Sequence, residues 1–283
     1  MMLSTAAKVR IARWLSTIVL GGRSLLGLSS RVTAHRRGIK WQLNLKEGID
    51  LAIYVLGGFE VRTLKRYEAL IKEGDVVLDI GANIGAHTLP LASLVGSSGK
   101  VYSFEPTAYA YSKQLVNIGL NPGLAPRIAA NQIMLTDSDS STLPEAIYSS
   151  WPLESAEDLH IEHRGRLMGT EGAKVSTLDA FLEGNAVKRV DFIKIDVDGN
   201  EASLLRGAKA SLVKFRPRIM IELAPYVHGD NPYEFDELVA GITALGYHFD
   251  DMATGKRLPS DPSKLKAFIP PLGGLNVLAT SSY

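Results

Sequence analysis

The sequence predicts an α/β fold in which a mostly parallel β-sheet is covered by helices on both faces. From Asp75 onward, short apolar segments typical of buried strands alternate with segments of helical periodicity. This alternation indicates parallel strands joined by crossover helices. Two of the apolar segments end in turns that combine glycine with acidic residues, at 79–85 and 196–201. Ligands bind at the carboxyl ends of strands in such sheets, so these turns are the first candidates for a functional site.

Seven strands are expected in the sheet, each from a short apolar segment bounded by polar or turn residues. Their ranges are 76–80, 101–105, 128–135, 190–196, 218–223, 247–252 and 275–280. The predicted helices cover 61–72, 86–95, 108–120, 201–214 and 232–245. Alternation of apolar and polar residues predicts a further, half-buried strand at 38–45.

Residues 137–174 do not follow this alternation and are expected to form an insertion. The segment is polar and contains several prolines and glycines, and loops of this length inside a domain are usually functional or disordered. His160 and His163 lie in it beside acidic residues. Solvated surface charge is favoured there over a metal site.

Composition and charge exclude several classes of protein. The 283 residues are 46% hydrophobic and 22% charged, as in an ordinary soluble globular protein, and contain no cysteine. Disulfides, cysteine-ligated zinc and a cysteine nucleophile are therefore excluded. Residues 1–46 contain nine basic residues and no acid, which leaves 47–283 with a net charge of −8. An acidic body repels nucleic acid phosphates, so no nucleic-acid partner is expected.

Residues 1–37 are expected to form a basic amphipathic arm that precedes a domain at 38–283. Apolar residues of the arm fall on one helical face: Ala7, Ile11, Trp14, Leu15, Ile18 and Val19. Three interpretations remain open, namely a helix packed on the body, a helix on an anionic membrane surface, and a targeting segment. The apolar run at 14–20 is too short to span a bilayer, which needs about 20 residues. The expected location is cytoplasmic, with or without peripheral membrane contact.

The turn after the strand at 76–80 has the sequence Asp79-Ile80-Gly81-Ala82-Asn83-Ile84-Gly85. A strand, a tight glycine turn and a helix start bring backbone N–H groups up to a ligand. The spacing differs from that of dinucleotide sites, and the Gly-Lys-Ser/Thr of phosphate-binding loops is absent. Asp79 at the strand end, with no Lys or Arg near the turn, favours a cofactor that carries a cation. S-adenosylmethionine carries both an ammonium and a sulfonium group.

A second acid supports this cofactor. The strand at 101–105 ends in Glu105, 24 positions after Gly81, and Pro106 follows it. In a βαβ unit, an acid at about 20 residues lies at the tip of the second strand and binds the ribose hydroxyls.

The segment 191–201 contains the second chemical motif. Lys194 and Asp196 alternate with apolar residues, so both are expected on one face of a buried strand. Asp196 and Asp198 would then lie beside the cofactor, because buried charge at a strand end is typical of working sites. The alternative is a structural Lys–Asp ion pair, with Asp198 or Asn200 capping the next helix.

Together, the sequences at 79–85, 104–106 and 194–201 resemble the FkbM family of S-adenosylmethionine-dependent methyltransferases. The usual family sequence Lys-Ile-Asp-Val-Glu-Gly-x-Glu is matched at 194–201, with Asp198 in place of the first Glu. The resemblance covers about residues 38–280 and leaves out the arm and the insertion. It implies the class I methyltransferase fold, a Rossmann-like seven-stranded sheet with one antiparallel edge strand. It also implies O-methylation of a hydroxyl, often on a sugar, glycan or polyketide.

The resemblance further implies a role for each matching residue. Its cofactor-binding positions are Asp79, Gly81, Asn83 and Gly85 at the methionine end, Glu105 at the ribose, and Asp137, or alternatively Thr136, near the adenine. Asp196 is the first candidate for the base that removes the hydroxyl proton, with Lys194 as its partner. His228 in the loop after the strand at 218–223 is the second. Asp196, Glu222 and His228 could jointly hold Mg²⁺ or Mn²⁺, but nothing in their spacing demands it, so no metal is expected.

The expected acceptor is a small molecule or glycan that carries a hydroxyl group. A polyketide or lipid acceptor, and a non-catalytic protein that only binds S-adenosylmethionine, are the alternatives, because a fold does not fix an activity. The oligomeric state has no signal in the sequence.

Overall fold

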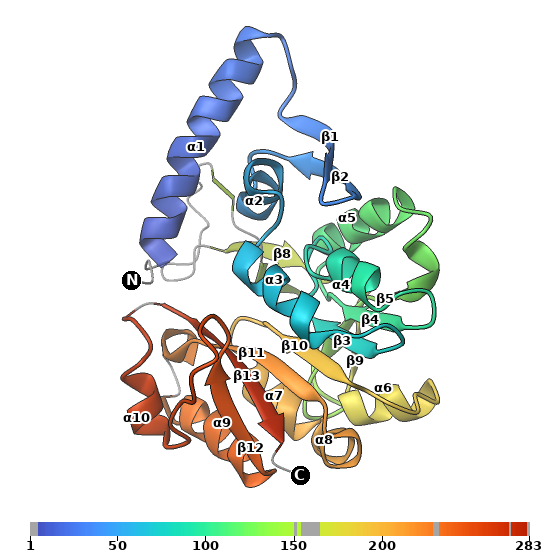
Figure 1. The fold of residues 1–283 in the computed structure, drawn as a ribbon, viewed down its shortest axis with the longest axis vertical. Helices are drawn as coiled ribbons and strands as arrows, with labels where there is room; N and C mark the ends of the chain where they lie inside the picture. Colours follow the sequence, from blue (N-terminus) through green and yellow to red (C-terminus); the bar gives the residue numbers. More distant parts are fainter. Residues whose placement is uncertain (1–4, 150–151, 154–164, 229–231, 272, 282–283) are drawn as a thin grey trace.

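The computed structural model describes residues 5–149, 152–153, 165–228, 232–271 and 273–281. Its central sheet contains β3 (Val76–Ile80), β4 (Lys100–Phe104), β5 (Ile128–Asn131), β10 (Phe192–Ile195), β11 (Arg218–Leu223), β12 (Tyr247–Asp251) and β13 (Leu275–Ser281). Across the sheet the order is β12-β13-β11-β10-β3-β4-β5 (Figure 1). All seven predicted strands are present, and the α/β class is confirmed.

Only β13 runs against the other strands of this sheet. The strands from β5 to β11 are parallel, and β13 pairs antiparallel with both β11 and β12. The antiparallel strand is therefore second from the edge, and not at the edge as the family resemblance implied. The crossover through α9 (Pro232–Ala244) places β12 one strand away from β11, and the returning β13 fills the gap between them.

Helices cover both faces of the sheet, because successive side chains of each strand point to opposite faces. On one face, α3 (Val61–Leu70) and α4 (Thr88–Leu94) pack against residues such as Val77 and Phe192. On the other, Leu78 and Ile193 belong to a larger core. Its helices are α6 (Leu178–Gly184), α7 (Glu201–Arg206), α8 (Lys209–Phe215), α9 and α10 (Pro262–Lys266). Lys194 and Asp79 lie opposite each other in the β3–β10 register.

Two predicted elements are interrupted in the structure. The strand expected at 128–135 ends at Asn131, and β6 (Ile133–Leu135) leaves the sheet to pair with β9 (Lys174–Ser176). The helix expected at 201–214 is divided into α7 and α8 at Gly207. A Cβ atom at Gly207 would lie 2.0 Å from the backbone oxygen of Thr136, so only glycine fits where the two segments cross.

The N-terminal segment forms structure of its own around a β-hairpin. It contains α1 (Thr5–Leu25), the paired strands β1 (Arg31–Arg36) and β2 (Ile39–Asn44), and α2 (Gly48–Leu56). The expected boundary between residues 37 and 38 therefore lies in the turn of the hairpin. The hairpin is joined to α5 (Ala108–Gly119) and the turn after it, because the Asn117 and Asn121 side chains accept hydrogen bonds from the β2 backbone.

The apolar stripe of α1 is divided between two surfaces. Leu15 and Val19 pack against the core formed by the hairpin and α2. Ile11, Trp14 and Ile18 point outward, with 46%, 65% and 53% of their surface exposed. Of the part of the chain that the structure describes, no helix is long and apolar enough to cross a membrane.

Within the expected insertion, β7 (Ala146–Ser149) and β8 (Arg166–Gly169) pair as antiparallel strands. Beyond β7, Leu153 donates a backbone hydrogen bond to Lys46, which ties the insertion to the N-terminal segment. His160 and His163 lie outside the described residues.

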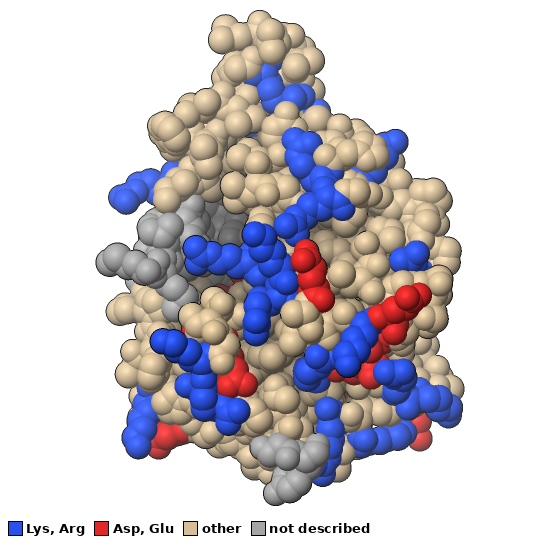
Figure 2. Space-filling view, viewed as in Figure 1, with Lys and Arg blue, Asp and Glu red and all other residues tan. Residues whose placement is uncertain are grey.

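Charge on the surface is less uniform than the acidic body suggested. Lys and Arg spread over much of the face that carries α1 and α3, with Asp and Glu at fewer points (Figure 2). On α3, Arg62 and Lys65 are exposed. The acidic excess of residues 47–283 is therefore not concentrated on this face.

Candidate active site

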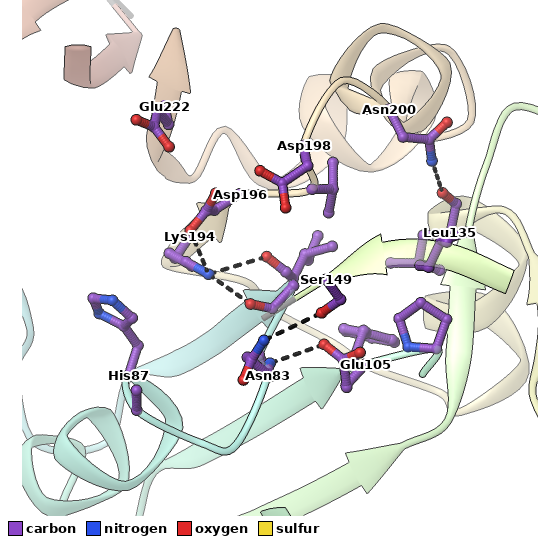
Figure 3. Close-up of a pocket in the computed structure, with 18 of the residues that line it drawn as sticks. Asn83, His87, Glu105, Leu135, Ser149, Lys194, Asp196, Asp198, Asn200 and Glu222 are labelled. Carbon is purple, nitrogen blue, oxygen red and sulfur yellow. Dashed lines mark hydrogen bonds and ion pairs between the residues drawn. The ribbon is translucent and has the colours of Figure 1, made fainter. Parts of the chain in front are cut away.

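A cavity opens at the carboxyl ends of β3, β4 and β10. The strands that follow β3 in the chain lie on both sides of it, with β4 on one side and β10 on the other, and ligands bind at such a point in open α/β sheets. Its wall combines the turns after these strands with parts of β6, β7 and the segment before α3 (Figure 3). The lining residues used below are Phe59, Glu60, Gly81, Asn83, His87, Glu105, Leu135, Ser149, Lys194, Asp196, Asp198, Asn200, Glu222 and Tyr226.

The glycine turn after β3 brings two strands into close approach. Gly81 has a positive φ of 77°, and a Cβ atom there would lie 1.8 Å from the backbone oxygen of Asp196. Asn83 also has a positive φ, which Asn tolerates better than most residues. The turn amides bind within the protein: Gly81 and Ala82 donate to the carbonyl of Phe104. The turn is therefore built to hold the Asp196 loop close, and these amides are not free for a ligand.

Lys194 is a fully buried cation between two carboxylates. Its Nζ atom lies 3.5 Å from Asp79 and 3.5 Å from Asp196, and donates to the backbone oxygen of Gly81 at 2.8 Å. Burial disfavours the ammonium charge, but the carboxylates of Asp196 and Asp79 reverse this effect and raise the pKa of Lys194. Lys194 therefore stays charged and fixes the Asp196 side chain, one-third of which is exposed, at the cavity wall.

Glu105 is held rigidly at the tip of β4. Its carboxylate accepts hydrogen bonds from the backbone N–H of Asn83 at 2.9 Å and from the backbone and hydroxyl of Thr107. Burial raises the pKa of Glu105, although these hydrogen bonds act in the opposite direction. The group thus presents a positioned carboxyl at the side of the cavity that faces Leu135 (Figure 3).

The loop after β10 is shaped by a second acid. Glu201 accepts hydrogen bonds from the backbone N–H groups of Val197 and Gly199, while the Asn200 side chain donates to the carbonyl of Leu135. Asn200 occupies the cap position of α7 but makes no side-chain bond to the helix backbone. The loop is therefore held by Glu201 and Leu135, and the alternative in which Asn200 caps the helix is wrong.

Asp198 has the left-handed backbone conformation, φ 48°, which is costly for a residue other than glycine. Asp198 is exposed overall and lines the cavity, with the carboxylates of Asp196 and Glu201 close enough to act on its charge. Desolvation, reinforced by the charges of Asp196 and Glu201, raises the pKa of Asp198 to about 8.

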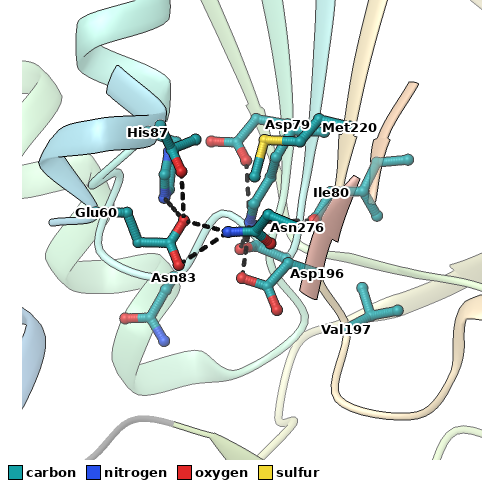
Figure 4. A network of polar contacts seen from close by, with 12 residues as sticks. Glu60, Asp79, Ile80, Asn83, His87, Asp196, Val197, Met220 and Asn276 are labelled. Carbon is teal, nitrogen blue, oxygen red and sulfur yellow. Dashed lines mark hydrogen bonds and ion pairs between the residues drawn. The ribbon is translucent and has the colours of Figure 1, made fainter. Parts of the chain in front are cut away.

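The far end of the cavity contains a polar network that the sequence motifs did not indicate (Figure 4). Asn276 donates to both carboxylate oxygens of Glu60, at 3.1 and 3.0 Å, and Glu60 lies 4.0 Å from Nε2 of His87. The Nδ1 atom of His87 is within 3.1 Å of the Tyr67 hydroxyl. Burial, reinforced by the charge of Lys194, lowers the pKa of His87 well below its usual range. The imidazole is therefore neutral at pH 7.

Most of the predicted site residues meet at this cavity, but Asp79, Gly85 and Asp137 do not reach its wall. Gly81, Asn83, Glu105, Lys194 and Asp196 all line it. Asp79 is fully buried beneath it, where it binds Lys194 and the Thr88 hydroxyl, and Gly85 lies behind the turn.

Asp137 lies outside the cavity, contrary to its expected place near the adenine. Its carboxylate pairs with Arg206 on the surface at 3.0 Å, and this ion pair lowers its pKa. The physical reason is that β6 has left the sheet before this residue. The apolar side chain of Leu135 lines the wall instead. Thr136 is buried and bonded to its own loop.

His228 ends the short helical turn η2 (Pro225–His228), and its side chain lies outside the described residues. Tyr226 of the same turn lines the cavity. Within the described ranges, no group of three His, Asp or Glu side chains is placed to hold a metal ion.

The contribution of the insertion was missed by sequence reasoning. Ser149 of β7 lines the cavity and accepts a hydrogen bond from the side chain of Asn83. The one available signal was the apolar run Ala146-Ile147-Tyr148, which is too short to stand out in a polar segment.

Comparison with known proteins identifies the family. The model of the methyltransferase FkbM domain matches residues 79–249, more than half of the chain. The chain therefore belongs to the FkbM methyltransferase family and has the Rossmann-like fold of S-adenosylmethionine-dependent methyltransferases.

Two curated proteins are similar to about half of this chain. Hexuronic acid methyltransferase AglP from Haloferax volcanii is 26% identical over 141 residues, which cover 50% of this chain and 53% of the relative. A probable cobalt-precorrin-6B C(15)-methyltransferase from Saccharolobus solfataricus is 27% identical over 167 residues, or 54% of this chain and 78% of the relative. The chain thus spans about half the length of AglP.

Among solved structures, an FkbM methyltransferase from Methylobacillus flagellatus is 16% identical with a TM-score of 0.46. The alignment covers 76% of this chain and 50% of that one.

Proposed function

We propose that this chain binds S-adenosylmethionine in the cavity and transfers the methyl group to a hydroxyl of a sugar, glycan or related small molecule. The observation that carries the proposal is the position of Asp196. Its carboxylate lies at the cavity wall beside the Gly81 turn, 3.5 Å from the buried ammonium of Lys194. A fixed carboxylate at this place suits the removal of a proton from a hydroxyl nucleophile.

Carboxylates and apolar surface in the cavity support this choice of cofactor. Glu105 at the tip of β4 suits the cis-diol of a ribose, and Leu135 offers apolar surface on the same side (Figure 3). Asp198 suits a cationic group of the cofactor. We assign Asp79 a supporting role, since it acts on the cavity through Lys194 and the Thr88 hydroxyl.

When bound, S-adenosylmethionine supplies a methyl group on a cationic sulfur, which leaves as a neutral thioether when the methyl moves to oxygen. The residues of this chain orient the acceptor hydroxyl and take its proton on a carboxylate oxygen of Asp196. Lys194 holds that carboxylate in place. The strand-end loops and Ser149 of the insertion enclose the reacting groups.

The likeness to a hexuronic acid methyltransferase supports an acceptor of the sugar class. A polyketide or lipid hydroxyl would use the same chemistry, and identification of the methylated product distinguishes these cases. A protein that binds the cofactor without turnover is the remaining alternative, and isotope-labelled methyl transfer separates it from an enzyme.

We also propose a peripheral contact between α1 and an anionic membrane surface. Ile11, Trp14 and Ile18 form an exposed apolar stripe on a helix whose opposite side is already packed. Arg10 is exposed one residue before this stripe. Apolar side chains beside basic ones are typical of helices that lie on anionic lipid.

Cofactor binding is tested first. Titration calorimetry should show binding of S-adenosylmethionine and none of NAD. Glu105→Ala should weaken that binding by about 1–3 kcal/mol, because it leaves a polar group of the ligand unpaired. Glu183→Ala, at an exposed site on α6, serves as the matched control and should bind like the parent. Tight NAD binding with no S-adenosylmethionine signal would contradict the proposal.

A further inference from the structure

The cavity has a second end, away from Glu105, that the cofactor proposal does not use. In Figure 3, Glu105 and Leu135 lie on one side, His87 and Glu222 lie on the other, and Asp196 with Lys194 lies between them. Phe59, Glu60 and Tyr226 also line this cavity. With the ribose assigned to Glu105 and the methyl group to the region of Asp196, the end around His87 is left for the acceptor.

Charge at this end is strongly one-sided. Glu60, Asp196 and Glu222 all line the cavity, and Lys194 is the one Lys or Arg among the described lining residues. Only 2% of the Lys194 side chain is exposed. Its ammonium group already contacts two carboxylates and two backbone carbonyls. Among the lining residues that the structure describes, an anionic acceptor would therefore meet carboxylates and no unshared positive group.

Hydrogen-bonding groups at the same end are fixed in place. Asn276 and the Thr63 hydroxyl donate to the Glu60 carboxylate, so that side chain is oriented before any ligand arrives. His87 lines the cavity with 3% of its surface exposed, and its Nε2 atom has no hydrogen-bond partner. A buried polar atom without a partner is unfavourable, and a ligand hydroxyl would satisfy it.

We propose that the acceptor is a neutral polyhydroxylated molecule, such as an uncharged sugar unit, and that one of its hydroxyls binds between Glu60 and Nε2 of His87. The two groups lie 4.0 Å apart, so one hydroxyl can donate to the carboxylate and bond to the imidazole. Phe59 and Tyr226 supply ring surface in the same lining. The charge of the described lining residues disfavours uronic acids and phosphorylated sugars. This inference rests on the proposed function and names its acceptor class.

The test compares sugars that differ only in charge. The methyl glycosides of glucose, galactose and mannose are paired with those of the corresponding hexuronic acids, which carry a carboxylate in place of the C6 hydroxymethyl group. Saturation-transfer NMR on the complex with S-adenosylhomocysteine measures binding without turnover. At least one neutral glycoside should bind, and its uronate should bind about a hundredfold more weakly, since like charges in contact repel each other strongly.

Variants locate the effect at Glu60. Glu60→Gln removes the charge and keeps the size, so the ratio of neutral to uronate affinity should fall by about tenfold or more. Glu68→Gln, on the helix α3 that follows Glu60 and with 61% of its side chain exposed, should leave the ratio unchanged. A merely structural role for Glu60 would weaken both sugars equally.

The outcomes separate this inference from the proposed function. Binding of no neutral glycoside, equal binding of the uronates, or an unchanged ratio in Glu60→Gln overturns the acceptor class. S-adenosylmethionine binding in the same samples shows that the cofactor proposal survives such a result. Loss of both signals in the parent protein overturns the proposed function itself.

Discussion

The motif at 191–201 left open whether Lys194 forms an ion pair within the fold or belongs to the functional site, and in the structure it does both. It forms a structural ion pair, and it also lies at the wall of the cavity. The two roles coincide because its partners differ: Asp79 is sealed beneath the cavity, whereas Asp196 reaches into it. A buried cation that binds one carboxylate on each side sets the orientation of the exposed one.

Asp196→Asn is the most direct test at the scale of single residues. The substitution keeps size and shape but removes the proton acceptor, so turnover should fall by about 10²–10⁴, the usual contribution of general base catalysis. S-adenosylmethionine affinity should change little, because Glu105 and the turn at 81–83 are untouched. Single-turnover methyl transfer to a glycoside that binds in the NMR experiment measures the rate.

Asp137→Asn provides the matched control for this experiment. Its carboxylate pairs with Arg206 on the surface, and losing an exposed ion pair costs only about 0–1 kcal/mol. This variant should bind the cofactor and turn over like the parent. Parental turnover in Asp196→Asn would mean that the proton is taken elsewhere, with His87 and His228 as the next residues to change.

The helix α1 shows why the apolar periodicity of a helix does not predict which of its side chains are covered by the rest of the protein. A single apolar stripe predicted one buried face for α1, but the hairpin and α2 cover only part of it. The helix packs through Leu15 and Val19, and Ser16 donates to the carbonyl of Leu45. Deleting the arm would therefore expose core, so substitution of its outer face is the cleaner experiment.

Replacing Ile11, Trp14 and Ile18 together with Ser should weaken binding to phosphatidylserine vesicles by about tenfold or more, because each side chain contributes apolar burial at the lipid interface. Cofactor affinity should stay at the parental value, since none of the three lines the cavity. Vesicle sedimentation measures the effect, and neutral phosphatidylcholine vesicles report the contribution of charge.

A second triple variant controls for the loss of surface apolarity. Leu115, Val213 and Phe268 are 45%, 56% and 54% exposed and lie on other elements, so their replacement with Ser should not alter sedimentation. Equal sedimentation of the parent and the α1 variant would leave α1 as a packed helix with no membrane role.

At the scale of the whole molecule, the sequence predicted those features whose residues are close together in the chain. Strands 76–80 and 192–195 and the acids beside their ends are neighbours in the chain, so periodicity and spacing located both the sheet and one side of the cavity. The order of strands and helices from Asp75 onward followed from this alternation, with three exceptions: the position of β13, the departure of β6 from the sheet and the division of the helix at Gly207.

The other end of the cavity depends on contacts that are distant in the sequence. Glu60 and Asn276 are 216 positions apart and meet only because β13 enters the sheet beside β11. The position of Asp137 outside the cavity has a similar origin. Pairing of β6 with β9, about 40 residues later, takes the chain out of the sheet before Asp137. No local pattern carries either piece of information.

Asp198 links the cavity to the stability of the whole protein. Its pKa is about 8 in the folded chain, against a usual value of 3.8, so the folded state holds this proton more tightly than the unfolded state. Stability from this group is therefore greatest below about pH 4 and is lost as the pH rises toward 8. Other buried groups also titrate, and the difference between the parent and Asp198→Asn isolates the contribution of Asp198.

Thermal unfolding of the two proteins between pH 5 and pH 9 measures that difference. The amide introduced by Asp198→Asn cannot ionise, so the variant should become more stable than the parent as the pH rises, with the largest gain in Tm above pH 8. A bound cation stabilises the ionised carboxylate of the parent, so saturating S-adenosylmethionine should narrow the gap. A gap that does not depend on pH would show that Asp198 titrates normally in the folded protein. A pH-dependent gap that the ligand leaves unchanged would place the cationic groups of the cofactor away from Asp198.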